Sequence, residues 1–161
     1  EIVWEYSGDY AGGLAGQHEP NMIEKGLPGE GNIILYDNGT PPLRNLAHIA
    51  RSYILEIDPA TGRIAWKYEN WEKFYSAFRS TVQRLPNGNT FICESDGPRL
   101  FEITPEGEII WEYAIEWHRI FGRAHRYPYN YCPQLKALGK PKEKRVTPPP
   151  HVRTRPHDWR A

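Results

Sequence analysis

The sequence predicts an all-β fold made of four-stranded antiparallel β-propeller blades, and two repeated patterns carry that prediction. A phrase of two apolar residues, tryptophan, a charge and tyrosine occurs three times, in EIVWEY at 1–6, GRIAWKY at 62–68 and GEIIWEY at 107–113. A glycine-containing turn and an apolar run precede the last two phrases, as GLPGEGNIILYDNG at 26–39 and RLPNGNTFICESDG at 84–97. Four short strands in roughly 45 residues are typical of one blade.

The segments between the turns have the composition of short strands. β-Branched and aromatic residues dominate them, and none shows the 3.6-residue period of a helix. The turns LPNGN and TPEGE contain Asn-Gly and Glu-Gly, which supply the positive φ that tight hairpins need. We therefore expect one blade from residues 18–39 and 51–68 and the next from residues 80–113. The clearest predicted strands are NIILYD, SYILEID, RIAWKY, NTFICE, RLFEIT and EIIWEY.

Outside this repeat the chain changes character. The segment TPPLRNLAHIA at 40–50 reads as a long loop inside the first blade, and such loops usually carry function or an interface. The closing segment, residues 114–132, is aromatic and basic. Residues 133–161 are Pro-rich, with eight Lys or Arg against two acidic residues, and should form an extended tail. The predicted organisation is thus the last strand of one blade plus two blades over 1–113, then the closing segment and the tail.

Composition and motifs exclude several classes of function. The 20 basic and 20 acidic residues give a formal net charge of zero, so no nucleic-acid footprint is expected. The Pro-rich spacing of the basic tail favours an extended strand on a protein surface instead. No run is long and apolar enough for a membrane helix. Nucleotide, zinc-protease and redox motifs are missing from the sequence. Cys93 and Cys132 could form one bridge, or Cys93 could be a buried thiol.

The repeated tryptophan is expected to pack each blade against its neighbour. The form D-x-x-T-G-x-x-x-W at 58–66 also resembles the tryptophan-docking motif of quinoprotein-type propellers. Tryptophan on a sheet face belongs to the core far more often than to a cofactor site. We therefore interpret Trp4, Trp66 and Trp111 as structural.

Three stretches carry a family resemblance: GQHEPNMIEKGLPGEGNIILYDNG, ARSYILEIDPATGRIAWKY and QRLPNGNTFICESDGPRLFEITPEGEIIWEY. Together they resemble the C-terminal blades of the arylsulfotransferase (aryl sulfate sulfotransferase) family, and RAHRYPYNY resembles the segment that closes many members. The likeness covers residues 1 to about 132. It implies a six-bladed propeller, exported to the periplasm or the cell exterior, that passes a sulfuryl group between phenols through a sulfohistidine without a cofactor. Open blade edges then imply a partner, either a missing N-terminal propeller half or another protein chain.

The resemblance also suggests site residues. His18 matches a channel histidine of the family, as a catalytic or sulfate-binding group, although a solvent-facing loop histidine is the plainer interpretation. Asn21 follows closely, but the family places its polar partner nearer, where Pro20 stands. Arg51, just before a predicted strand, either binds an anion in the channel or is a surface arginine.

A departure from the family pattern leaves the function open. Ser80 stands where the sulfotransferases offer a channel histidine, and serine cannot form a sulfohistidine. Arg79 and Ser80 together could still bind an anion. Two functions therefore remain: an arylsulfotransferase-like protein, active or degenerate, and a non-catalytic propeller module whose tail straps a partner subunit.

The remaining histidines are scattered and give no metal-binding spacing. His118 and His125 lie in the Arg-rich part of the closing segment, with Arg119, Arg123 and Arg126. This stretch either contacts an anion or is pinned across the propeller by bonds from arginine to backbone carbonyls.

Overall fold

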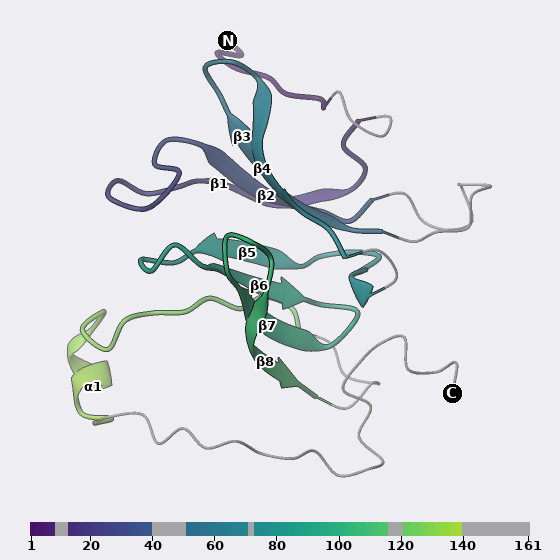
Figure 1. The fold of residues 1–161 in the computed structure, drawn as a ribbon. Coiled ribbons are helices and arrows are strands. Elements are labelled where there is room, and N and C mark those ends of the chain that lie inside the picture. The colour runs from purple at the N-terminus through teal and green to yellow at the C-terminus, as the bar shows by residue number, and fades with distance from the viewer. Residues whose placement is uncertain (9–12, 40–50, 71–72, 116–120, 140–161) are drawn as a thin grey trace, which may run out of the picture.

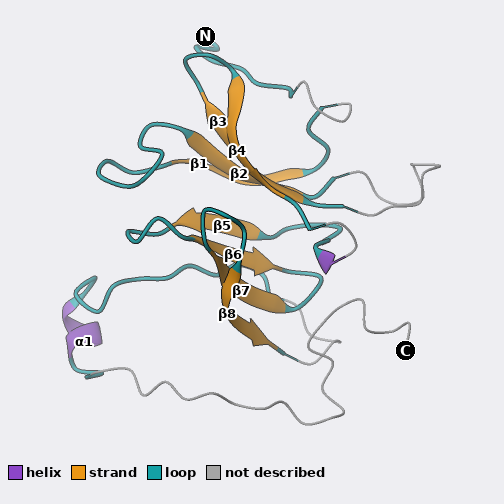
Figure 2. Cartoon of the chain, in the orientation of Figure 1, coloured by secondary structure: helices purple, strands orange, loops and turns teal. Residues whose placement is uncertain are grey.

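The structure, a computed structural model, describes residues 1–8, 13–39, 51–70, 73–115 and 121–139. Two four-stranded antiparallel sheets make up most of it, and in each the strands pair in chain order (Figures 1 and 2). The first sheet contains β1 (Gln17–Met22), β2 (Ile33–Asp37), β3 (Tyr53–Asp58) and β4 (Arg63–Tyr68). The second contains β5 (Thr81–Arg84), β6 (Thr90–Glu94), β7 (Arg99–Ile103) and β8 (Ile109–Ala114). The chain is therefore all-β, and each sheet has the form of the predicted blade.

The predicted hairpin turns are formed. Between β5 and β6, Gly88 has a φ of 87° and donates its N–H to the carbonyl of Leu85 at 2.9 Å. Between β7 and β8, Gly107 has a φ of 88° and donates to the carbonyl of Thr104 in the same way. A side chain at either glycine would be strained, because residues with a Cβ rarely adopt positive φ.

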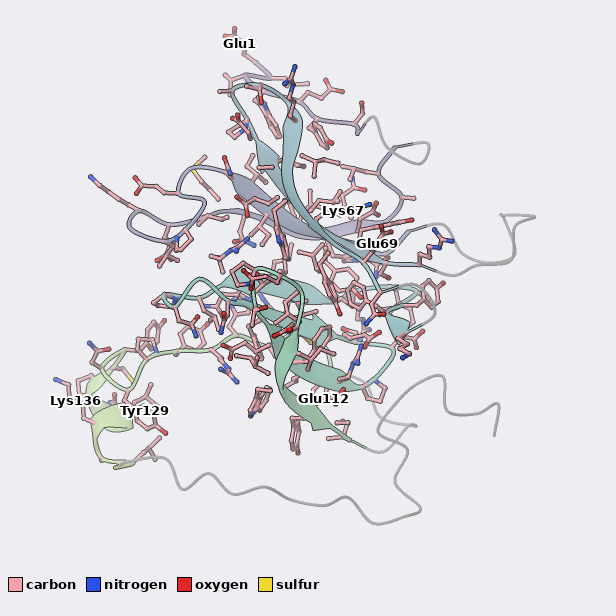
Figure 3. All side chains as sticks on the ribbon, in the orientation of Figure 1. Glu1, Lys67, Glu69, Glu112, Tyr129 and Lys136 are labelled. Carbon is pink, nitrogen blue, oxygen red and sulfur yellow. The ribbon has the colours of Figure 1, made fainter. Side chains whose placement is uncertain are left out.

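The main core lies between the two sheets, where side chains from both meet (Figure 3). Phe74, from the linker between the sheets, is fully buried at its centre. Its ring makes edge contacts with Tyr36 of the first sheet at 5.4 Å and Phe101 of the second at 5.8 Å between centroids. Each such aromatic side chain contributes about 1.5–3 kcal/mol by leaving water. The linker therefore acts as a plug that holds the two sheets together.

The repeated tryptophans also join neighbouring elements. Trp66 on β4 packs against the main core, and its Nε1–H donates to the carbonyl of Pro105 in the second sheet at 2.8 Å. Trp4 donates in the same manner to Pro59 of the first sheet at 3.0 Å. Each acceptor lies in the turn before a tryptophan-bearing strand. The predicted blade-packing role of Trp66 is confirmed, whereas Trp4, which is 40% exposed, contacts the first sheet from outside the described strands.

Two segments differ from the prediction. Residues 1–6 were expected to form the last strand of a preceding blade, yet none of the described strands pairs with them. A strand forms only when a neighbouring strand supplies its hydrogen bonds, and the repeat pattern shows only that residues 1–6 have the composition of a strand. At the start of the predicted extended tail, α1 (Pro133–Lys136) forms one helical turn. Pro133 favours this because its fixed φ suits the first helical position.

The described residues settle the cysteine question. Cys93 and Cys132 are both free, and Cys93 is fully buried on β6. Burial raises the pKa of the Cys93 thiol to about 11, so it remains protonated at neutral pH. Cys93 is thus a small apolar core residue rather than half of a bridge.

Several predictions fall outside the described residues. These are the inserted loop at 40–50, which contains His48, and the part of the closing segment that contains His118. Residues 140–161 of the tail lie outside as well. None of the helices within the described ranges is long and apolar enough to cross a membrane.

Candidate functional site

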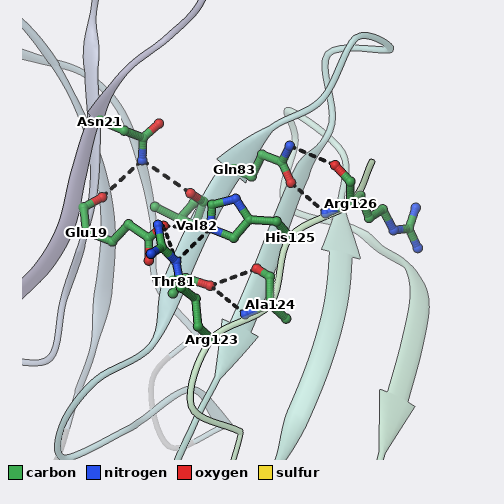
Figure 4. Close-up of polar contacts among 9 residues, drawn as sticks. All are labelled: Glu19, Asn21, Thr81, Val82, Gln83, Arg123, Ala124, His125 and Arg126. Carbon is green, nitrogen blue, oxygen red and sulfur yellow. Dashed lines mark hydrogen bonds and ion pairs between the residues drawn. The ribbon is translucent and has the colours of Figure 1, made fainter. Parts of the chain in front are cut away.

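The closing segment lies along β5, the first strand of the second sheet (Figure 4). Thr81 donates its hydroxyl to the carbonyl of Ala124 at 3.0 Å. Gln83 donates to the carbonyl of Arg126 at 3.1 Å, and the N–H of Arg126 returns a bond to Gln83 at 2.9 Å. The segment is therefore pinned across the sheet, as one interpretation of the sequence expected. The bonds come from Thr and Gln side chains, whereas the sequence suggested arginine.

The closing segment contacts the second sheet in the way that the end of β5 contacts the first sheet. Arg84, at the end of β5, pairs with Glu56 of the first sheet and lies 5.0 Å from the ring centre of the β4 tryptophan. Arg126 pairs likewise with Glu102 of the second sheet and lies 4.5 Å from the ring centre of Trp111. Glu56 and Glu102 each face the tryptophan of the adjacent strand in the ladder. Arg126 thus repeats, one step further along the repeat, the contacts of Arg84.

His18 lies on β1, and its orientation is set by two acceptor oxygens. The Nδ1 atom is 3.0 Å from the carbonyl oxygen of Gly16 and 2.6 Å from Oδ1 of Asn38. Since both oxygens only accept, Nδ1 must carry the hydrogen, and the lone pair of a neutral ring is then on Nε2. A histidine held in this tautomer presents Nε2 as a nucleophile or metal ligand.

The oxygen of Asn38 is aimed at His18 by a buried network. Asn38 is 1% exposed and donates its Nδ2 hydrogen to the carbonyl of Ser76 at 2.8 Å, which leaves Oδ1 for the imidazole. Ser52, also buried, donates its hydroxyl to the carbonyl of Asn38 at 3.1 Å and accepts the N–H of Ser76 at 3.0 Å. Three segments outside the strands, at Asn38, Ser52 and Ser76, therefore converge to fix one imidazole nitrogen.

Glu19, the residue after His18 in the chain, joins two side chains of the closing segment. Oε1 of Glu19 lies 2.6 Å from Nε2 of His125 and 3.0 Å from Nε of Arg123 (Figure 4). Glu19 has a φ of 47°, which is unusual for a residue with a side chain. It lies in an irregularity of the ladder between His18 and Asn21, where β1 bulges against β2. The bulge turns Glu19 toward the closing segment, over 100 residues away in the chain.

Asn21 and Arg79 have ordinary contacts. The Nδ2 group of Asn21 donates to the carbonyl of Glu19 at 3.0 Å and to that of Val82 at 3.4 Å. Asn21 therefore joins the inner strands of the two sheets. Arg79 is exposed, has a φ of 58°, and its guanidinium lies 5.5 Å from the ring centre of Phe78.

Ser80 is buried, and its hydroxyl is already bonded. Its N–H donates to Oγ of Ser95 at 2.9 Å, and its own Oγ accepts the N–H of Ser95 at 3.1 Å. The ladder pairs His18 with the fourth residue of β2, and Thr81 with the fourth residue of β6. By this register Thr81, not Ser80, has the place of His18 in the second sheet.

Arg51 precedes β3 and is partly buried. Its backbone carbonyl lies so close to Gly39 that a Cβ on that glycine would be 1.9 Å from the oxygen. Gly39 follows Asn38 directly, so the backbone of Arg51 approaches the network that holds His18. Among the described residues, no group of three or more His, Cys, Asp or Glu could hold a metal ion.

Comparison with known families decides the relationship. A model of the arylsulfotransferase (ASST) family matches residues 1–116 of the 161 residues. The chain belongs to the arylsulfotransferase family. No curated protein and no solved structure matches it. The family match includes both sheets and His18, and it ends at residue 116, before the part of the closing segment that contains His125.

The sequence analysis of this arylsulfotransferase-family chain proposed His18 as a site residue, but it did not propose Asn38, Ser76 or Glu19. Asn38 sits in the turn sequence DNG, where a turn role is the ordinary expectation. Ser76 lies in an aromatic linker without any motif. Glu19 adjoins His18, which is a weak signal, and nothing local links it to His125. Only the folded sheet brings these groups together.

Proposed function

We propose that this protein transfers a sulfuryl group from an aryl sulfate to a phenol, with His18 as the nucleophile. The observation that carries the proposal is the Nδ1 of His18 bonded to two acceptor oxygens, because this leaves the Nε2 lone pair for attack. Family membership supplies the substrate class. A nucleophile held by a second group in this manner is typical of covalent catalysis.

The proposed reaction has two steps at the same nitrogen. Nε2 of His18 attacks the sulfur of the aryl sulfate, the bond from sulfur to the aryl oxygen breaks, and the aryl oxide leaves. The oxygen of a phenol then attacks the sulfur and gives up its proton, which balances the proton that the departed aryl oxide takes up, and the sulfur–nitrogen bond breaks to restore the imidazole. Oδ1 of Asn38 accepts the hydrogen bond from Nδ1–H throughout and so stabilises the positive charge that develops on the ring. No cofactor takes part in this scheme.

The sulfate oxygens need cationic or hydrogen-bonding groups. We assign Arg51 to this role because its backbone approaches the network behind His18. Arg79, exposed at the start of β5, is a second candidate. Asn21 and Ser80 already use their polar groups in the fold and serve as supports for the inner strands.

We also infer that the two blades work within a larger propeller and that the protein is exported, as its family suggests. Apolar side chains of β8 support the first inference, because they are exposed on an outer strand. They are Ile109, Ile110 and Tyr113. A missing propeller half, or another protein chain, would cover them.

A second candidate function is a non-catalytic propeller module whose tail straps a partner subunit. Ser80 favours it when residues are counted back from the turn, because the resemblance puts a channel histidine there and this serine is buried and bonded to Ser95. Under this reading His18 would be a structural residue and no covalent intermediate would form.

Transfer from 4-nitrophenyl sulfate to phenol, followed by intact-mass measurement, tests the proposal. We expect turnover by the full chain and one added sulfuryl group on His18 when the acceptor is omitted. His18→Ala should abolish both, whereas Gln17→Ala, an exposed neighbour on β1, should keep both. Normal turnover in His18→Ala would remove this histidine from the mechanism. Neither turnover nor adduct in the wild type would favour the non-catalytic module.

A further inference from the structure

We propose that the closing segment completes the acceptor side of this site, with His125, oriented by Glu19, taking the proton of the phenol that receives the sulfuryl group. This inference rests on the proposed function and adds to it a base from outside the family match, which ends at residue 116.

The protonation pattern of His125 follows from its neighbours. The carboxylate of Glu19, 2.6 Å from Nε2, is nearer than Nε of Arg123 at 3.3 Å. A carboxylate only accepts hydrogen bonds, so Nε2 carries the ring hydrogen and Nδ1 carries the lone pair. A carboxylate that holds one imidazole nitrogen while the other receives a proton is the arrangement of general-base histidines.

The base is held firmly although it lies in a segment without regular structure. The residues on either side of it, Ala124 and Arg126, are both bonded to side chains of β5. Arg126 is fixed further by its ion pair with Glu102. On the opposite side, Glu19 is directed by its positive φ, a conformation that is retained mainly where the surroundings enforce it.

The residue that orients this base adjoins the proposed nucleophile in the chain. Glu19 follows His18 directly, so their Cα atoms are about 3.8 Å apart on β1. Tyr127 extends the surface away from His125, with ring planes within 19° of parallel and centroids 6.2 Å apart. Tyr131 lies 4.5 Å from Tyr127, and both tyrosines are exposed. Exposed aromatic rings beside a base suit the ring of a phenol, which stacks on them favourably.

The proton balance covers both steps. In the second step the phenol oxygen bonds to sulfur, its proton passes to Nδ1 of His125, and the sulfur–Nε2 bond of His18 breaks. The resulting imidazolium is stabilised by the carboxylate of Glu19. In the first step of the next cycle it returns that proton to the departing aryl oxide. A good leaving group such as nitrophenolate departs without this proton, so the first step then needs the base least.

Rapid-mixing kinetics separate the two steps in the full chain. Release of nitrophenol without acceptor reports the first step, and transfer to added phenols reports the second. His125→Gln should keep the nitrophenol burst but slow transfer to phenol by about 10²–10⁴-fold, the usual contribution of a general base. The loss should shrink with a more acidic acceptor such as a nitrophenol. Glu19→Gln should reproduce this acceptor dependence with a smaller loss.

The outcomes are distinct. Unchanged transfer in His125→Gln, or an equal loss with acidic and ordinary phenols, would overturn the role of this base. Absence of a burst in the wild type would overturn the proposed function and this inference with it. Tyr129→Ala, at an exposed residue of the same segment, is the matched control and should behave as wild type. If His125→Gln lowers the unfolding midpoint, Glu19→Gln supplies the comparison, because Gln can still accept the bonds from Arg123 and the bonds of Ala124 and Arg126 to β5 are untouched.

Discussion

Arg84 and Arg126 make the same contacts in successive interfaces but differ in exposure, so replacing each by methionine gives a matched test of burial. The side chain of Arg84 is 5% exposed and that of its partner Glu56 is 7% exposed. The side chain of Arg126 is 37% exposed, while its partner Glu102 is 4% exposed. Burial lowers the pKa of the Arg84 guanidinium, and the charge of Glu56 opposes that shift.

The expected magnitudes follow from these environments. Arg84→Met leaves the Glu56 carboxylate buried with a bond from Asn32 at 2.6 Å, and removal of one partner of a buried pair costs about 3–5 kcal/mol. Arg126→Met removes a guanidinium that water screens, and the buried Glu102 keeps bonds from Asn87 and Asn89, so we expect a loss of about 1 kcal/mol and a lost stacking contact of similar size. We therefore expect Arg84→Met to lower the free energy of unfolding by at least about 2 kcal/mol more than Arg126→Met.

Urea unfolding followed by tryptophan fluorescence measures the difference. Both variants should shift the midpoint without changing the slope, since the surface exposed on unfolding is nearly the same. Equal losses in the two variants would refute the argument from burial. A loss of less than about 1 kcal/mol for Arg84→Met would show that the cost of burying the two charges nearly cancels their attraction.

Three further predictions concern stability. Gly39→Ala should cost at least about 2 kcal/mol in the free energy of unfolding, because φ is +71° and the new Cβ would meet the carbonyl of Arg51; an unchanged melting temperature would contradict this. Trp66→Phe should lower the free energy of unfolding by about 1 kcal/mol, because the bond from Nε1 to the carbonyl of Pro105 is lost; a melting curve that matches the wild type would refute this. Burial raises the pKa of Glu94 from 4.5 to about 7. The folded state then keeps a proton that the unfolded state releases, so stability should fall by roughly 3 kcal/mol as pH rises from 4.5 to 7, and Glu94→Gln should flatten that profile.

The blades could be predicted from the sequence because every signal for them is local. Strand composition, Asn-Gly turns and the recurrent tryptophan each occupy a few neighbouring residues, and each was confirmed where the structure describes it. The residues that meet at the interface between the sheets were harder to predict from the sequence. Trp66 could be assigned to a blade contact, but its acceptor Pro105 lies 39 residues away, and its position depends on how two sheets stack.

The candidate site was harder to predict than the blades, because its residues are far apart in the sequence. The family resemblance suggested His18, yet the tautomer of its ring depends on Asn38, 20 residues later, and on the buried carbonyl of Ser76. The pairing of Glu19 with His125 spans 106 residues. No periodicity or spacing rule relates groups at such separations, because they meet only after the sheets and the closing segment have packed.

The comparison between Ser80 and His18 shows how a single backbone irregularity alters a functional argument. Counted back from the turn, Ser80 occupies the channel-histidine position, and its presence suggests a lost nucleophile. The bulge between His18 and Asn21 adds a residue to β1, so the ladder aligns His18 with Thr81 instead. The hydroxyl of Thr81 is bonded to the closing segment through Ala124. The second sheet therefore uses this position to anchor the segment that carries His125, while the first sheet keeps an imidazole there, and in our proposal the two blades supply different parts of one reaction.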